Sequence, residues 1–290
     1  MSTPVIEVEK LNLTYGNFHA VKDLSFEVRP GELYALLGTN GAGKTSALET
    51  IEGHREPTSG TVRVFGHSPR DRKAVRPRMG IMLQESGFSP DLTVRESVRL
   101  IGQLTGRTDD AGRILDVVGL TRKAGTLVSQ LSGGEKRRLD FATAVWGTPE
   151  LIFLDEPTTG LDIQSRDALW ESVDRLRENG STIVLTTHYL EEAQQRADRI
   201  GLMHQGVFRR QGTVSELTRA LPSHIRFAFP DGPALPLSSS VDGNAVVIET
   251  FELQKDLHLL LGWAQDNGVE LRDLSAGPTS LDDVFRAIEA

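Results

Sequence analysis

Leu33-Tyr34-Ala35-Leu36-Leu37 runs directly into Gly38-Thr39-Asn40-Gly41-Ala42-Gly43-Lys44-Thr45, and these residues indicate the fold. The apolar run has no polar alternation, which is typical of a parallel strand buried on both faces. The glycine-rich run matches GxxxxGK[ST], in which backbone N–H groups surround phosphates and the next helix adds its positive N-terminal dipole. We therefore predict a strand, a phosphate-binding loop over residues 38–45 and a helix that carries Ala47, Leu48 and Ile51.

This loop forms the first part of a candidate nucleotide site. Lys44 is expected to reach the β- and γ-phosphates, and the hydroxyl of Thr45 is expected to hold Mg²⁺. The nucleotide-binding residues expected here are Gly38, Thr39, Asn40, Gly41, Ala42, Gly43, Lys44, Thr45 and Ser46.

Two carboxylates follow a second buried strand. The apolar run over residues 151–154 ends in Asp155 and Glu156, and an open α/β sheet binds its ligand at the carboxyl ends of its strands. Asp155 suits a magnesium shell, and Glu156 is then free to polarise or deprotonate an attacking water. A third run, residues 181–185, completes a set of strands that alternate with helices, which predicts an α/β fold.

Two further regions surround this core. Residues 1–30 alternate apolar and polar side chains, which predicts an antiparallel β subdomain. Residues 91–147 have an almost wholly helical pattern, which predicts an inserted helical subdomain opening with a capping box at Thr93 and Glu96. The helices expected in and after it begin at Thr93 and run over Asp110–Val118, Gly134–Trp146 and Ile163–Glu178.

The composition changes after Thr218, where prolines and serines punctuate short apolar runs. We predict an ATP-binding type of domain over residues 1–218 and a small α+β domain over residues 219–290. The elements expected in the second domain are strands at 225–229, 245–249 and 269–271, a helix at 253–265 and a closing helix at 280–289.

Composition excludes several classes of protein. The 290 residues include 40 acidic and 32 basic side chains, and the net charge of −8 argues against a nucleic-acid partner, which would show a basic face. The absence of cysteine excludes disulfides, a thiolate nucleophile and Cys-based metal sites. No window approaches the ~18 apolar residues of a spanning helix. The N-terminus lacks a basic region before an apolar block, so we expect a cytoplasmic chain.

Ser132-Gly133-Gly134-Glu135, after Leu131, is a second candidate anion site. Taken alone, it is also compatible with an ordinary turn and helix start, with Ser132 as the N-cap. The two glycines permit a close backbone approach, and the same helix start can bind an anion. Its place in the chain, between the phosphate loop and the carboxylates, makes the segment informative.

Taken in order, these motifs resemble those of the ATP-binding subunits of ABC transporters, over about residues 5–215. Residues 38–45 resemble the Walker A loop, and residues 151–156 resemble the Walker B strand with its catalytic glutamate. Residues 131–135 resemble the signature segment, with glutamate where glutamine is commoner in the last position. The remaining matches are Gln84 for the Q-loop, Asp162 for the D-loop, His188 for the switch histidine and Tyr15 for the aromatic that stacks on adenine.

The resemblance implies a P-loop ATPase that works as a pair. Each subunit would bind ATP through its own Walker A loop, while residues 132–135 would contact the nucleotide of the other copy in a head-to-tail homodimer. His188 would contact the γ-phosphate and steady the attacking water with Glu156. Tyr15 would stack on adenine, although an aromatic in such a strand is also typical of a core. The catalytic set would be Glu156, His188, Lys44 and Gln84, the Mg²⁺ ligands Thr45, Gln84 and Asp155, and the further nucleotide contacts Tyr15, Ser132, Gly133, Gly134, Glu135 and Asp162.

The C-terminal residues narrow the resemblance to one class of ABC transporter. Residues 277–285 resemble the closing motif of daunorubicin-type drug-resistance exporter subunits, which lie at the cytoplasmic side of the membrane, pair with a separately encoded permease and export drugs, lipids or polymers. A coupling helix of the permease would meet the segment after Gln84. The ATPase of an importer or a lipoprotein-release system is the alternative. A soluble ABC ATPase of translation or repair is disfavoured, because the chain has one Walker A loop and only 88 residues lead from Lys44 to Ser132.

Overall fold

The computed structural model describes residues 3–82, 87–219, 221–228, 233–243 and 245–289. The chain divides into two units, 1–211 and 212–290, each described below by itself. The division falls after Gln211 rather than after Thr218, because helix α8 (Val214–Thr218) contacts helix α10 (Leu281–Glu289) within the second unit. Within the described ranges, no helix is both long and apolar enough to cross a bilayer.

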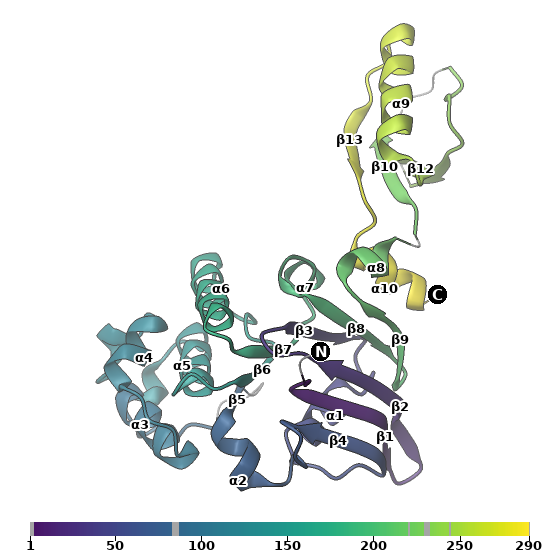
Figure 1. The fold of residues 1–290 in the computed structure, drawn as a ribbon. Helices are drawn as coiled ribbons and strands as arrows, with labels where there is room; N and C mark the ends of the chain where they lie inside the picture. Colours follow the sequence, from purple (N-terminus) through teal and green to yellow (C-terminus); the bar gives the residue numbers. More distant parts are fainter. Residues whose placement is uncertain (1–2, 83–86, 220, 229–232, 244, 290) are drawn as a thin grey trace. The chain divides into compact units, whose positions relative to one another are not determined.

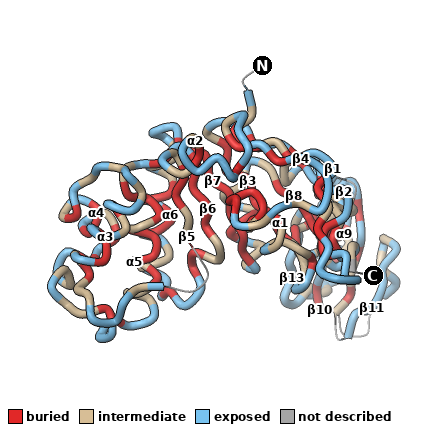
Figure 2. The backbone as a smooth tube through the Cα atoms, turned by 90° about the horizontal axis from the view of Figure 1, so that it is seen from below, coloured by how far each residue is buried: buried red, intermediate tan, exposed pale blue. Residues whose placement is uncertain are grey.

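A six-stranded sheet forms the centre of the first unit, in the order β5-β6-β7-β3-β8-β9 (Figure 1). The pairs β5–β6, β6–β7, β7–β3 and β3–β8 are all parallel, as the uninterrupted apolar runs predict. Figure 2 shows why these runs lack alternation: both faces of β3, β6 and β7 are buried. The strands are β3 (Leu33–Gly38), β5 (Met79–Met82), β6 (Leu151–Asp155), β7 (Thr182–Thr186), β8 (Arg199–His204) and β9 (Val207–Gly212).

A three-stranded antiparallel sheet, β2-β1-β4, accounts for the alternation near the N-terminus. Helix α1 (Lys44–Ile51) follows the phosphate loop and contacts the strands of this sheet as well as β3. Its Ala47, Leu48 and Ile51 are buried. The strands are β1 (Ile6–Tyr15), β2 (Phe18–Val28) and β4 (Ser59–Val64).

The helical subdomain lies where the sequence predicts it. Helix α3 (Val94–Thr105) opens with the expected capping box of Thr93 and Glu96. Helix α4 (Ala111–Val117) is capped by Asp110 and helix α5 (Gly133–Val145) by Ser132. Two short 3₁₀ turns lie between α4 and α5. The other helices of this unit are α2 (Arg72–Val75), α6 (Ile163–Glu178) and α7 (Leu190–Arg196), and the 3₁₀ turns are Arg76–Arg78, Thr121–Lys123 and Val128–Gln130.

The second unit is a four-stranded antiparallel sheet, β11-β12-β10-β13, covered by helix α9 (Leu253–Asn267). Its core contains Ile225, Phe227, Val246, Ile248 and Leu260. The strands are β10 (Ser223–Ala228), β11 (Ser240–Asp242), β12 (Ala245–Thr250) and β13 (Arg272–Gly277).

The strand predicted at residues 269–271 is wrong, because the pairing begins later, at Arg272. Gly268, with φ 63°, ends α9, and the N–H of Val269 still donates to the carbonyl of Ala264 at 2.9 Å. Val269 therefore completes the helix cap instead of joining the sheet. The short strand β11 was not predicted.

Candidate nucleotide-binding site

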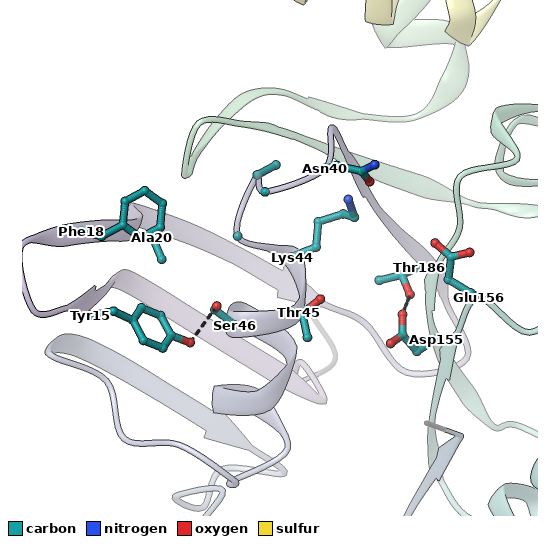
Figure 3. A pocket seen from close by; sticks show the side chains of 13 residues that line it. Tyr15, Phe18, Ala20, Asn40, Lys44, Thr45, Ser46, Asp155, Glu156 and Thr186 are labelled. Carbon is teal, nitrogen blue, oxygen red and sulfur yellow. Dashed lines mark hydrogen bonds between the residues drawn. The ribbon is translucent and has the colours of Figure 1, made fainter. Parts of the chain in front are cut away.

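A cavity of about 480 Å³ lies where the phosphate loop meets the ends of β6 and β7 (Figure 3). The loop follows β3, and the sheet order β6-β7-β3 places the carboxyl ends of these strands side by side. The cavity therefore brings together segments that are over a hundred residues apart in sequence. Its lining residues are Tyr15, Phe18, Ala20, Asn40, Gly41, Ala42, Gly43, Lys44, Thr45, Ser46, Asp155, Glu156 and Thr186.

The loop conformation depends on glycine at position 43. Gly43 has φ 95°, and a Cβ atom there would lie 2.4 Å from the carbonyl oxygen of Ala20. Gly43 is also the N-cap of α1 and brings no capping side chain. The first N–H groups of a helix have no partner within the helix, so those of α1 remain available to an anion, with the helix dipole behind them.

Lys44 lies inside the cavity with its ammonium folded onto the loop. Its Nζ donates to the carbonyl oxygens of Gly38 at 2.6 Å and Thr39 at 3.1 Å. Burial lowers the pKa of Lys44, while Asp155 and Glu156 favour its charged form. A phosphate in the cavity would offer this desolvated ammonium a stronger, charged acceptor than two carbonyls.

Asp155 is oriented by a residue that the sequence analysis missed. The Thr186 hydroxyl at the end of β7 donates to its Oδ1 (Figure 3). The two residues are register partners on adjacent parallel strands. The signal was available, since both buried runs end in a polar residue, but it required knowing that β6 and β7 are neighbours. Thr45 and Asp155 supply a hydroxyl and a carboxylate to one cavity, the oxygen ligands that Mg²⁺ prefers.

Glu156 stands in an unusual backbone conformation, with φ 53°. Its N–H donates to the carbonyl of Thr186 at 3.0 Å. Its carboxylate accepts from the Thr159 hydroxyl at 3.0 Å and pairs with Nδ1 of His188. The structure thus brings together the carboxylate and the imidazole that the family resemblance places in one reaction, although 32 residues separate them.

Two aromatic side chains border the other end of the cavity. Tyr15 and Phe18 are paired residues of the β1–β2 hairpin, and Phe18 is 63% exposed. The Tyr15 hydroxyl shares a hydrogen bond of 2.9 Å with Ser46, and the guanidinium of Arg55 lies 4.4 Å from the Tyr15 ring centroid. Phe18 and Ala20 were not predicted, because a hairpin strand of mixed pattern gives no sign of which side chains face a ligand.

The signature residues lie outside the cavity. None of residues 132–135 lines it, and Asp162 does not either. Ser132 and Glu135 form a reciprocal capping box, in which Ser132 N–H donates to Glu135 at 2.9 Å. That hydrogen bond is the main cause of the lowered pKa of Glu135, and Lys123 adds to it at 3.1 Å.

The remaining predicted residues fall in three places. Gly38 and Thr39 contact Lys44 beneath the cavity. Asp162 caps α6 by accepting from Ser165 N–H at 2.8 Å. Gln84 lies outside the described residues.

Comparison with known proteins agrees with this geometry. A family model described as ABC transporter matches residues 21–159, and one described as ABC transporter domain-containing protein-like, C-terminal domain, matches residues 223–280. The daunorubicin/doxorubicin resistance ATP-binding protein of Streptomyces peucetius is 34% identical, over 99% of this chain and 92% of that protein. Nod factor export ATP-binding protein I of Paraburkholderia xenovorans is 40% identical, over 75% of this chain and 73% of that protein.

The fold has a matching solved relative. A dimeric post-hydrolysis structure of an ATP-binding cassette bound to ADP and Pi superposes with a TM-score of 0.66 at 26% identity, over 72% of this chain and 98% of that one. Four observations agree on one family: the phosphate loop, the paired carboxylates, the signature segment and the relative that matches 99% of this chain. The chain belongs to the ABC transporter family, as an ATP-binding and ATP-hydrolysing subunit of the exporter type.

Proposed function

We propose that two copies of this chain close head to tail around two ATP molecules and so drive a separately encoded membrane permease. The observation that carries this proposal is that the signature residues of a chain lie apart from the nucleotide cavity of the same chain. The cavity contains the phosphate loop and both carboxylates, whereas none of residues 132–135 lines it. A second copy could supply those residues, and the relative bound to ADP and Pi is dimeric.

Within each site, the loop holds the nucleotide and the strand ends hold the metal. Lys44 exchanges the carbonyls of Gly38 and Thr39 for the β- and γ-phosphates. Thr45 and Asp155, with Gln84, are the residues that would hold Mg²⁺, and Thr186 keeps the Asp155 carboxylate turned toward the cavity. When bound, Mg²⁺ neutralises charge on the phosphate oxygens.

Glu156 and His188 act on the water. Glu156 accepts a proton from the attacking water as its general base, a role that typically contributes about 10²–10⁴-fold to a rate. His188, paired with that carboxylate, orients it and contacts the γ-phosphate. Ser132 and the first N–H groups of α5 in the other copy hold the same γ-phosphate. Hydrolysis removes this bridge, so the pair opens.

A groove of about 490 Å³ between α3 and β5 is the proposed seat of the permease. Its lining includes Ile81 of β5, the strand that leads to Gln84, and Leu104 of α3, which is 74% exposed. Arg72, Arg76 and Arg107 also line it. We propose that a short permease helix with an apolar face and an acidic residue binds here, which places the chain at the cytoplasmic side of the membrane. Its relatives are named for daunorubicin/doxorubicin resistance and Nod factor export, and we propose that its cargo is a drug, a lipid or a polymer.

Copurification tests the partner directly. The Glu156→Gln chain, tagged and purified from its native membrane with ATP and Mg²⁺, should bring down a small six-helix permease, identified by mass spectrometry. The double variant Glu156→Gln with Leu104→Glu should lose the permease but keep ATP binding, because binding of the permease helix would then have to bury a carboxylate. A substrate-binding protein in the complex would favour the importer alternative. Ribosomes, or no membrane protein, would contradict the proposal.

A further inference from the structure

Helix α5 contacts both the signature segment and the catalytic carboxylates of the same chain. Ser132 caps its first turn. Arg137, in its second turn, is 7% exposed. Its Nη2 atom donates to the carbonyl oxygen of Asp155 and, at 2.6 Å, to that of Glu156. One guanidinium therefore donates hydrogen bonds to the main chain of two consecutive residues at the end of β6.

These hydrogen bonds lie at a residue, Glu156, whose backbone conformation needs stabilisation. Glu156 has φ 53°, a conformation that side-chain-bearing residues rarely adopt. Hydrogen bonds from a charged donor are shorter and stronger than neutral ones. The position of the Glu156 carboxylate follows from this backbone conformation, because the backbone sets the direction of the Cα–Cβ bond. The side chain of Glu156 thereby reaches Thr159 and His188.

A second contact links the same helix to the turn that follows. A Cβ atom built on Gly134 would lie 3.6 Å from both the carbonyl oxygen of Gly160 and a methyl carbon of Leu161. The helix start therefore packs closely against the loop between Glu156 and Asp162. A shift of α5 would move both contacts together, since a helix of this length is stiff.

We infer that Arg137 is a positioning residue that couples the two nucleotide sites: the α5 helix that receives the partner's γ-phosphate at Ser132 sets, through Arg137, the placement of Glu156 in its own site. This inference rests on the proposed head-to-tail pair. As a consequence, ATP bound in one site helps to position Glu156 in the other site. Hydrolysis therefore requires ATP in both sites.

The test measures the rate of hydrolysis separately from ATP binding and from the pairing of two chains. Full-length Arg137→Met should bind ATP with an affinity within about twofold of wild type, and in the Glu156→Gln background it should still pair when ATP is added. Its kcat should fall by at least about tenfold, because small misplacements of a catalytic group cost up to ~10²-fold. Arg137→Lys, which can reach one carbonyl, should recover part of that rate.

Arg138→Met is the matched control. Arg138 is the next residue of α5, but its guanidinium donates to the carbonyls of Val118 at 3.4 Å and Gly119 at 3.3 Å, away from β6. This variant loses an arginine from the same helix and should keep kcat within about threefold of wild type. A kcat near wild type in Arg137→Met overturns the inference, as does an equal loss in the control. If Arg137→Met does not fold, a kcat of Arg137→Lys equal to that of wild type overturns the inference as well, because lysine can reach only one of the two carbonyls.

Ser132→Arg, measured in the same assays, separates the two proposals. If it blocks pairing and hydrolysis while Arg137→Met has full activity, the head-to-tail pair stands and only the coupling fails. If Ser132→Arg pairs and hydrolyses ATP normally, the pair itself is wrong and the coupling fails with it.

Discussion

Two glycines of the phosphate loop share a backbone conformation but differ in their surroundings. Gly41 has φ 76° with nothing within 4 Å of an added Cβ, whereas Gly43 has φ 95° and an added Cβ would lie 2.4 Å from the carbonyl of Ala20. The first requires glycine for its backbone angle alone. The second also requires it because β2 passes directly beside the loop.

Alanine at these positions should separate the two costs. Gly41→Ala should lower the free energy of unfolding by about 1 kcal/mol, the usual cost of a left-handed residue. Gly43→Ala should lower it by about 3 kcal/mol, because the methyl group also displaces backbone. Urea unfolding of the two variants measures the difference, and equal losses would show that the approach of β2 costs nothing.

At this scale, the sequence predicted residues whose roles are local. Lys44 and Thr45 follow from the loop pattern, and Asp155 follows from the end of an apolar run. Thr186 and Phe18 could not be predicted, because each reaches the site through a neighbouring strand. Glu135, in place of the commoner glutamine, caps α5 together with Ser132, which is a local role. Its ion pair with Lys123 at 3.1 Å could not be predicted, because Lys123 lies in a separate turn.

At the scale of elements, Asp109 joins two helices of the inserted subdomain. Its carboxylate, 5% exposed, accepts hydrogen bonds from Arg113 of α4, from the N–H of Asp110 at 2.7 Å and from the N–H of Gly147, after α5, at 2.8 Å. Burial opposes its ionisation, but the hydrogen bonds outweigh burial and hold the pKa of Asp109 below its usual range.

Asp109→Asn should therefore destabilise the protein in a pH-dependent way. The lowered pKa means that the folded state favours the ionised carboxylate, so its contribution is complete above the unfolded pKa of about 3.9 and is lost as the pH falls through the folded value. Near pH 7 the variant should lose about 2 kcal/mol, typical of hydrogen bonds to a charged group. Urea unfolding from pH 7 to pH 3 should show this loss shrinking below about pH 4.

The exposed Asp116 on α4 provides the control. Asp116→Asn should change the free energy of unfolding little at any pH, as surface substitutions usually do. A loss for Asp109→Asn that stays constant from pH 7 to pH 3 would contradict a role for the charged carboxylate.

Helices with clear start signals were predicted best among the elements. α3 and α6 begin where their capping residues stand, and α6 runs over Ile163–Glu178 as predicted. β13 was misplaced because all but one of its residues are exposed, so no buried apolar face marks its limits. Its limits are set by pairing with β10, which a local pattern does not encode.

At the scale of the full chain, the contacts divide the two units after Gln211, whereas the sequence predicts a boundary after Thr218. The end of β9 and the helix α8 lie close together in sequence, and only the contact between α8 and α10 assigns α8 to the second unit. The same limit applies to the site. The motifs imply that Ser132 serves a second copy, but only the folded chain places residues 132–135 outside the cavity that holds Lys44 and Asp155.

The most direct measurement is the mass of the Glu156→Gln chain by light scattering, with and without ATP and Mg²⁺. Glu156→Gln keeps every nucleotide contact but loses the general base, so we expect a monomer without ATP and a stable dimer with it. Adding Ser132→Arg to this variant should return the monomer while ATP still binds. A monomer that persists with ATP bound, or a dimer that Ser132→Arg leaves intact, would contradict the nucleotide-closed pair.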